Sequence, residues 1–187
     1  MSLLTTNYLT PTGREEAWRF TPLKRLAGLH DLSSVVKENI SLSASGALPS
    51  GVSLKVVTAS DLPPAYESSD LVTNRIRENV KDISLLRIEK DSEVSQPIHL
   101  KRSCGSSAEL SKLVIQAGVN SRSTVIIENT GTGEIGEEIE ISLEAGASLN
   151  FISLQEWDRS AVHIGQHHAI ISKDAQFTSF YKTKKNK

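Results

Sequence analysis

Cysteine is almost absent from this sequence: Cys104 is the only one in 187 residues. A single cysteine cannot form an internal disulfide, so a secreted disulfide-stabilised scaffold is excluded. No apolar run approaches the roughly 20 residues of a membrane-spanning helix. The N-terminus also lacks the basic and apolar stretches of a signal peptide. These absences favour a cytoplasmic protein that does not enter a membrane.

Aromatic residues are also scarce, at 5% of the chain, and neither sign of charge dominates, with 21 Lys and Arg against 22 Asp and Glu. This balance gives no basis for binding nucleic acid or a membrane surface, so neither partner is expected. Apolar residues make up 38% and charged residues 23%, as in soluble globular domains. The apolar residues are mainly Ile, Val, Leu and Ala, which favours strands.

The chain opens with a charged segment, GREEAWRFTPLKRL (13–26), that contains one of the two tryptophans. It predicts a short helix that ends near Pro22, because the residue before a proline is pushed out of the α region. Trp18 and Phe20 are the aromatic side chains of this arm. We expect both to anchor the arm on the core or on a partner.

The region that follows mixes strand and helix. Residues 53–64 contain a short strand that ends at a proline pair. Residues 68–82 carry the clearest helical pattern, with Ser69 or Asp70 as the N-cap. We therefore expect a helical and mixed N-terminal region over residues 1–82.

Residues 83–181 consist of short apolar segments separated by Gly, Asn and Ser, as expected for strands. The segments repeat weakly at an offset of 28 residues, which places Thr124 over Ile152. Strands at this spacing with no returning helix predict a solenoid of stacked coils. A β-sandwich is the competing architecture. A Lys-rich tail, 182–187, follows this core.

Three histidines within six residues, His163, His167 and His168, are the candidate metal ligands. Residues four apart in a strand lie about 13 Å apart, so His163 and His167 cannot share one zinc ion, whose ligand nitrogens lie about 2 Å from the metal. His168 faces the opposite side of the strand, and only Glu140 lies beneath it in the repeat. We expect polar residues of a solenoid face or subunit interface, with a metal site as the alternative.

Other reactive groups are few. Lys101 and Arg102 would lower the pKa of Cys104 if their charges lie close, but no partner thiol exists, so we expect a structural cysteine. The chain has no nucleophile elbow and no phosphate-binding glycine loop. From Ser123 to Asp158 there are eight acidic residues and no Lys or Arg, which indicates one acidic face, either solvated or a docking face for a basic partner.

Three segments carry a resemblance to a known family. REEAWRFTPL (14–23) resembles the N-terminal signature of SufD proteins, which belong to the family of SufB and SufD iron–sulfur cluster assembly factors. LLRIEKDSEVSQPIHL (85–100) resembles the entry into the family's core. Residues 141–180 resemble its first repeats, with a Gly-Ala turn, a strand ending in Leu-Gln, a histidine and an Asp-Ala turn. The opening segment favours SufD over SufB.

The resemblance implies a mainly β fold, with a right-handed parallel β-helix behind the N-terminal region. It implies a non-catalytic scaffold subunit that pairs with a SufB-like chain and a SufC-like ATPase. The complex handles the iron–sulfur cluster, and no cofactor is assigned to this chain. Because family members are considerably longer, the resemblance also implies an N-terminal portion of such a protein.

Two further hypotheses come from the residues themselves. The histidines of 163–168 leave open a metal-dependent β-rich enzyme. The last predicted coil, 170–181, ends in an unpaired edge, and open sheet edges pair with other edges. We therefore expect the isolated chain to form a homo-oligomer through this edge.

Overall fold

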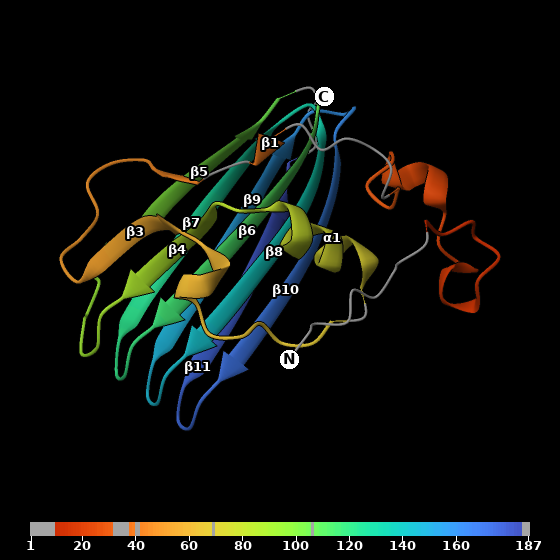
Figure 1. Cartoon of the computed structure of the whole chain (residues 1–187). Helices are drawn as coiled ribbons and strands as arrows, with labels where there is room; N and C mark the ends of the chain where they lie inside the picture. Colours follow the sequence, from red (N-terminus) through yellow and green to blue (C-terminus); the bar gives the residue numbers. More distant parts are fainter. Residues whose placement is uncertain (1–9, 32–37, 40–41, 69, 106, 185–187) are drawn as a thin grey trace.

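The computed structural model describes residues 10–31, 38–39, 42–68, 70–105 and 107–184, whose elements are labelled in chain order (Figure 1). The N-terminal elements are η1 Glu16–Trp18, η2 Leu23–Leu26, β1 Glu38–Asn39, β2 Ser43–Ala44, β3 Val52–Val57, η3 Ala59–Asp61 and α1 Leu71–Asn79. The remaining strands are β4 Ile83–Ile88, β5 Ile98–Cys104, β6 Ala108–Ala117, β7 Arg122–Gly131, β8 Glu134–Leu143, β9 Ser148–Trp157, β10 Val162–Ile171 and β11 Gln176–Thr183.

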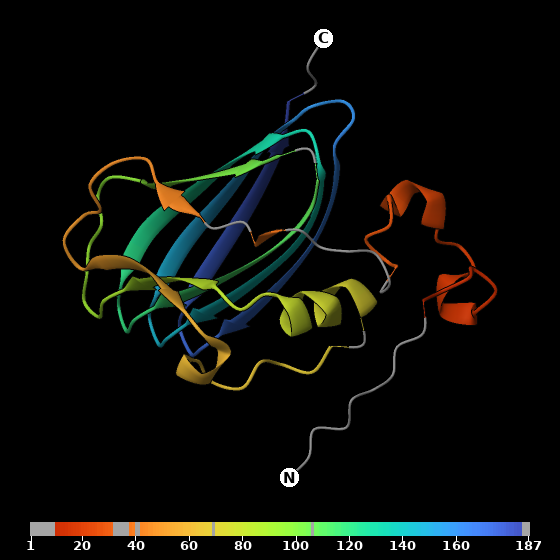
Figure 2. The ribbon, with the colours of Figure 1, turned by 45° about the horizontal axis from the view of Figure 1, so that its top comes forward.

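From β4 onward, successive strands alternate between two sheets that face each other (Figures 1 and 2). Sheet A has the order β10-β8-β6-β4-β3, with β1 paired to β6, and sheet B has the order β11-β9-β7-β5-β2. The pairs among β4 to β11 are parallel, whereas β2 and β3 pair antiparallel to their neighbours. The chain therefore winds as a β-solenoid of about four turns. The predicted β-helix architecture is confirmed, and the β-sandwich alternative is wrong.

The coils differ in length, which corrects the predicted repeat. Between β7 and β9, Thr124 pairs with Asn150, so the expected pairing of Thr124 with Ile152 is wrong by two residues. Between β9 and β11 the predicted offset of 28 holds. The difference lies at the corners, because β7 and β8 are joined by residues 132–133 and β9 and β10 by residues 158–161.

Strand alternation sends every second side chain into the space between the sheets, which we call the lumen. Much of the lumen is packed with apolar side chains that have almost no exposed surface. They include Leu86, Leu100, Leu113, Ile115, Val125, Ile127, Ile139 and Phe151. Polar side chains replace them at the corner where strands of sheet B end and strands of sheet A begin.

The helix α1 packs on the outer face of sheet A (Figure 2). Asp70 caps it by accepting a hydrogen bond from the Thr73 N–H at 2.7 Å, so this predicted cap is confirmed, while Ser69 lies outside the described residues. Ile76 joins Leu110 of β6 in one buried apolar cluster. Within the described ranges, no helix is long and apolar enough to cross a membrane.

The N-terminal arm contains two short 3-10 helices in place of the single predicted helix. Residues 19–22, which end with Pro22, separate the two helices. Trp18 is half-buried, whereas Phe20 is 86% exposed. The arm is held on the rest of the protein by Leu29, which follows the second 3-10 helix. Leu29 is 1% exposed and packs in the buried apolar cluster that contains Ile76 of α1. Arg75 Nη1 donates to the Leu29 carbonyl oxygen at 2.9 Å. Anchoring of a partner by Trp18 and Phe20 stays a prediction.

Candidate functional site

Five polar side chains meet inside the lumen beyond the apolar packing. We call them the lumen cluster, and its members are Arg102 of β5, Asn129 of β7, Glu137 of β8, and His163 and His167 of β10. They alternate with outward-facing residues of the same strands, so the strand period places them inside. Arg102 and Glu137 are each 1% exposed and Asn129 is 0% exposed. Groups this deeply buried require polar partners.

An ion pair crosses the lumen from one sheet to the other. Arg102 Nη1 lies 2.9 Å from Glu137 Oε1 and donates to Asn129 Oδ1 at 3.2 Å. Burial by itself would raise the pKa of Glu137, but Arg102, and after it the hydrogen bond with His163, holds that pKa well below its usual range. Glu137 is therefore an anion inside the protein. Nε and Nη2 of Arg102 are buried without a hydrogen-bond partner in the described part of the chain.

Both inward-facing histidines approach the same carboxylate. His163 Nε2 lies 2.6 Å from Glu137 Oε2, and His167 Nε2 lies 3.9 Å from Glu137 Oε1. Gly165, which pairs with Glu137 in the ladder, leaves the space for this, because a Cβ there would lie 3.3 Å from the His163 ring. Glu137 was not among the residues expected from the sequence to form a site. Glu137 pairs in the ladder with Gly165, which lies midway between His163 and His167. The strand register, had it been known, would therefore have identified Glu137.

His167 also joins the last strand to the cluster. The Tyr181 hydroxyl of β11 is hydrogen-bonded to His167 Nδ1, and Phe151 meets the same ring edge-on with centroids 5.7 Å apart. Burial lowers the pKa of His167, and Glu137 opposes that shift only in part. The His167 imidazole is therefore neutral at neutral pH.

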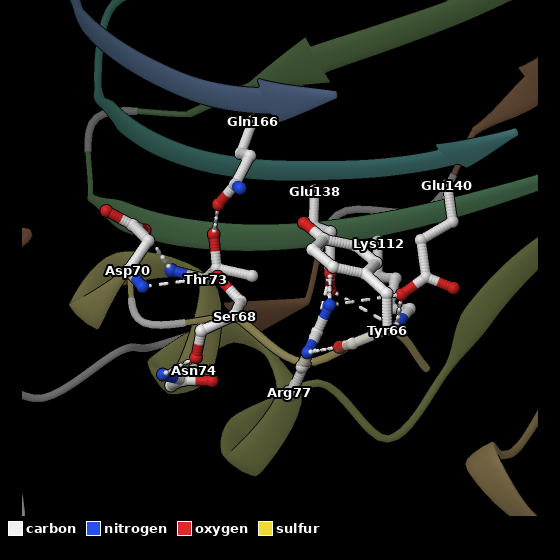
Figure 3. A network of polar contacts seen from close by, with 10 residues as sticks. All are labelled: Tyr66, Ser68, Asp70, Thr73, Asn74, Arg77, Lys112, Glu138, Glu140 and Gln166. Carbon is white, nitrogen blue, oxygen red and sulfur yellow. Dashed lines mark hydrogen bonds and ion pairs between the residues drawn. The ribbon is translucent and has the colours of Figure 1, made fainter. Parts of the chain in front are cut away.

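A second polar cluster lies on the opposite face of sheet A, beneath α1 (Figure 3). We call it the outer cluster, and its members are Tyr66, Arg77, Lys112, Glu138 and Glu140. Arg77 Nη2 lies 2.5 Å from Glu138 Oε1, and Lys112 Nζ lies 3.2 Å from Glu138 Oε2. Lys112 Nζ is also 2.8 Å from Glu140 Oε1. Two cations thus meet two carboxylates and tie α1 to β6 and β8.

Tyr66 fixes the segment that leads into α1. Its ring stacks on His168 at a centroid distance of 3.7 Å, and the Arg77 guanidinium lies 4.5 Å from the centre of the same ring. Burial raises the pKa of Tyr66 and that of Glu138, although Arg77 and Lys112 favour the charged form of Glu138. The outer cluster is thus a stabilising connection between the N-terminal region and the solenoid.

The structure separates the three candidate metal ligands. His163 and His167 lie inside the lumen, whereas His168 lies on the outer face and pairs with Glu140 in the ladder, as predicted. Among the described residues, no group of three or more His, Cys, Asp and Glu side chains has the arrangement to hold a metal ion. The metal-enzyme hypothesis therefore gains no supporting observation.

Cys104 differs from the expectation that nearby cations would lower its pKa. The side chain is 4% exposed and packs with Ile135 and Trp157. Burial, and then Glu109, raises its pKa to about 12. Arg102 lies two residues away but is paired with Glu137, so its charge is not available to Cys104. The thiol is structural, as the sequence indicated, and it is a poor nucleophile.

The expected single acidic face is also corrected. Glu137 and Glu138 are 1% and 0% exposed and point to opposite sides of sheet A. Their cations come from outside the acidic segment: Arg77 and Lys112 for Glu138, and Arg102 for Glu137. The absence of Lys and Arg between 123 and 158 therefore marks strands whose charge partners lie on neighbouring elements.

Comparison with known proteins agrees with this architecture. Residues 99–186 match the family model for the SUF system FeS cluster assembly, SufBD core domain. The chain is 30% identical over 169 residues to an iron-sulfur cluster assembly SufBD family protein of Mycobacterium leprae, a match that covers 88% of this chain and 43% of that protein. It is 28% identical over 171 residues to such a protein of Mycobacterium tuberculosis, covering 88% of this chain and 42% of that protein.

The chain thus spans less than half the length of these relatives. No solved structure gives a significant match. The parallel β-solenoid and the match to the SufBD core domain agree on the class of protein. The chain belongs to the SufBD family.

Proposed function

We propose that this chain is the scaffold portion of a SufD-like subunit, which in the cytoplasm pairs with a SufB-like chain and a SufC-like ATPase. The observation that carries the proposal is the match of residues 99–186 to the SufBD core domain, together with the parallel pairing of β4 to β11. The exposed edge of β10 and β11 supports it. Strands β10 and β11 lie at the ends of their sheets, each with a strand paired on one side in the described structure. Such an edge is a template for pairing with further strands.

The side chains at this end are apolar and exposed. They are Ile170 at 57%, Ile171 at 50%, Phe180 at 58% and Tyr181 at 55% exposed. Large exposed apolar groups that cluster at a sheet edge are typical of interaction surfaces. The opening segment with Trp18 and Phe20, which resembles that of SufD proteins, supports the assignment to the SufD side of the family.

A role without catalysis is supported by the chemistry of the chain. Cys104, the only thiol, is buried and has a pKa raised to about 12. The sequence contains no phosphate-binding glycine loop, so ATP hydrolysis belongs to the SufC-like partner in this proposal.

Co-purification tests the proposal. The tagged chain is co-expressed with the SufB-like and SufC-like chains of its own genome, and partner recovery is measured. We expect both partners to be recovered, and Phe180→Lys to lower recovery by about tenfold, since a charge in an apolar interface costs binding energy. Val56→Lys is the matched control, because Val56 is 60% exposed on β3, the opposite end of sheet A. Failure of the wild-type chain to recover a partner would contradict the proposal.

We also propose that the isolated chain self-associates through the 170–181 edge. Without a partner, the exposed strands and side chains of this edge are free to pair with a second copy. Light scattering over a concentration series should give a mass above that of a monomer, and Phe180→Lys should return it to the monomer. A monomeric mass at every concentration would contradict self-association without affecting the assignment to a complex.

A further inference from the structure

The lumen cluster contains more titratable groups than a structural ion pair requires. The groups that face Glu137 or its neighbours are Arg102 and Cys104 from β5, Glu109 from β6, His163 and His167 from β10, and Tyr181 from β11. Strands β7 and β9 contribute the neutral side chains of Asn129, Ser153 and Gln155, of which the first two share a hydrogen bond. Glu109 is occupied elsewhere, accepting from the Gly105 N–H at 2.9 Å.

The charges of the cluster balance only while the histidines are neutral. Arg102 contributes one positive charge and Glu137 one negative charge, and both are 1% exposed. A proton on His163, 2.6 Å from the carboxylate, adds a second positive charge to this pair. A proton on His167 adds a third positive charge, whereas Glu137 is, among the described residues, the single carboxylate in contact with these groups. Buried charge without a partner is costly, so the second protonation opposes the closed arrangement.

The same two histidines are the polar contacts of the last coil with the coil beneath it inside the lumen. His163 Nε2 of β10 lies 2.6 Å from Glu137 Oε2 of β8, and His167 Nε2 lies 3.9 Å from Glu137 Oε1. The hydrogen bond between Tyr181 and His167 then joins β11 to β10 within the same coil. Inside the lumen, β10 is therefore joined to the coil beneath it through one carboxylate, that of Glu137, and β11 is joined to β10 through His167.

We propose that Glu137, His163 and His167 form a pH-sensitive latch, which holds the last coil, β10–β11, on the solenoid at neutral pH and releases it in mildly acidic solution. The sign follows from His167. Its pKa is lowered in the fold by burial, whereas in the opened coil it takes a proton at the ordinary histidine value of about 6.5. The stability of the closed coil is therefore complete above that value and decreases as the pH falls below it.

Hydrogen exchange measured by mass spectrometry tests the latch on the whole chain. Exchange of β10–β11 amides is compared at about pH 7.5 and about pH 5.5, corrected for the intrinsic pH dependence of exchange. We expect protection of β10–β11 to fall by about tenfold at the lower pH while that of β6–β7 is unchanged. His167→Gln should abolish this difference. His99→Gln should retain it, because His99 is exposed on the outer face of β5.

Fluorescence gives a second readout that does not depend on the folding of His167→Gln. The Trp157 ring of β9 lies 5.4 Å from the His163 ring of β10, so the surroundings of Trp157 change when β10 moves away. In a Trp18→Phe background, Trp157 emission should change on acidification as the coil is released, and His99→Gln should leave that change intact. Equal protection of β10–β11 at both pH values, or the same loss in His167→Gln as in the wild-type chain, would overturn the latch.

Discussion

Arg77 on α1 lies 2.5 Å from Glu138 on β8, and this contact joins the N-terminal region to the solenoid. The Glu138 side chain has no exposed surface, and Arg77 is 19% exposed. Sixty-one positions separate the two residues in the sequence, so the contact closes a long loop. The helix is consequently held on sheet A by charge as well as by apolar packing.

Removing the cation of this pair should destabilise the protein. Arg77→Ala leaves Glu138 buried with Lys112 as its remaining cation, and loss of one partner of a buried pair costs about 3 kcal/mol. Urea unfolding measures the loss. Lys101→Ala is the control, because its pair with Glu128 is exposed on both sides and is worth about 0.5 kcal/mol. Equal losses in the two variants would show that the outer cluster is not a stabilising connection.

Glu137 should make the fold sensitive to acid. Its pKa is depressed in the folded state, so it contributes stability above its unfolded value of about 4.3, and this contribution is lost as the pH falls through the folded value. We expect Glu137→Gln to have lower stability at neutral pH and a shallower decline below about pH 4.3. Unfolding free energies at a series of pH values measure both. Glu128→Gln, on the exposed face of sheet B, should keep the wild-type decline.

Cys104 should resist alkylation in the folded protein. Since its pKa is raised to about 12 and its side chain is 4% exposed, almost no accessible thiolate exists at neutral pH. Mass spectrometry after iodoacetamide treatment should show unmodified native protein and complete modification in denaturant. Rapid modification of folded protein would mean that the corner around Cys104 opens readily.

Gly131 should tolerate no side chain. Its φ is +134°, and a Cβ there would lie 2.1 Å from the Cys104 carbonyl oxygen. Strain and overlap together predict that Gly131→Ala lowers the free energy of unfolding by about 3 kcal/mol. Gly46→Ala is a suitable comparison, since nothing lies within 4 Å of a Cβ at that position. Similar melting temperatures for the two variants would contradict the close approach.

The arm aromatics should affect binding and stability differently. Phe20 is 86% exposed, so Phe20→Ala should leave the unfolding free energy unchanged and reduce capture of partners. Trp18 is half-buried, and Trp18→Ala should lower stability or partner binding by about 2 kcal/mol. Denaturant midpoints and co-purification yields measure both. If neither variant changes either quantity, the arm is not an anchor.

The strand-rich core was predictable because its signals are local. Alternation in Glu138–Leu143 predicts a half-buried strand, and this segment lies within β8. The side chain of Asp70 and the apolar spacing after it predict the start of α1 correctly. The coil offset was predictable only in part, because the corner at 132–133 is two residues shorter than the corner at 158–161.

The lumen cluster was not predictable, because its partners are distant in the sequence. Arg102 precedes Glu137 by a whole coil, and their contact crosses from sheet B to sheet A. Periodicity shows which residues face inward but not which inward residues meet across the lumen. The histidines were recognised as unusual, but their shared carboxylate lies in another coil, and in the sequence it looks like one more member of an acidic segment.

Glu137 and Glu138 are consecutive in β8, yet one is bound inside the solenoid and the other beneath α1. The single strand β8 is thus fixed from both faces at adjacent positions. Sliding of this strand along its axis would break ion pairs on both sides at once. The position of β8 is therefore set jointly by a helix outside the solenoid and by an ion pair inside it.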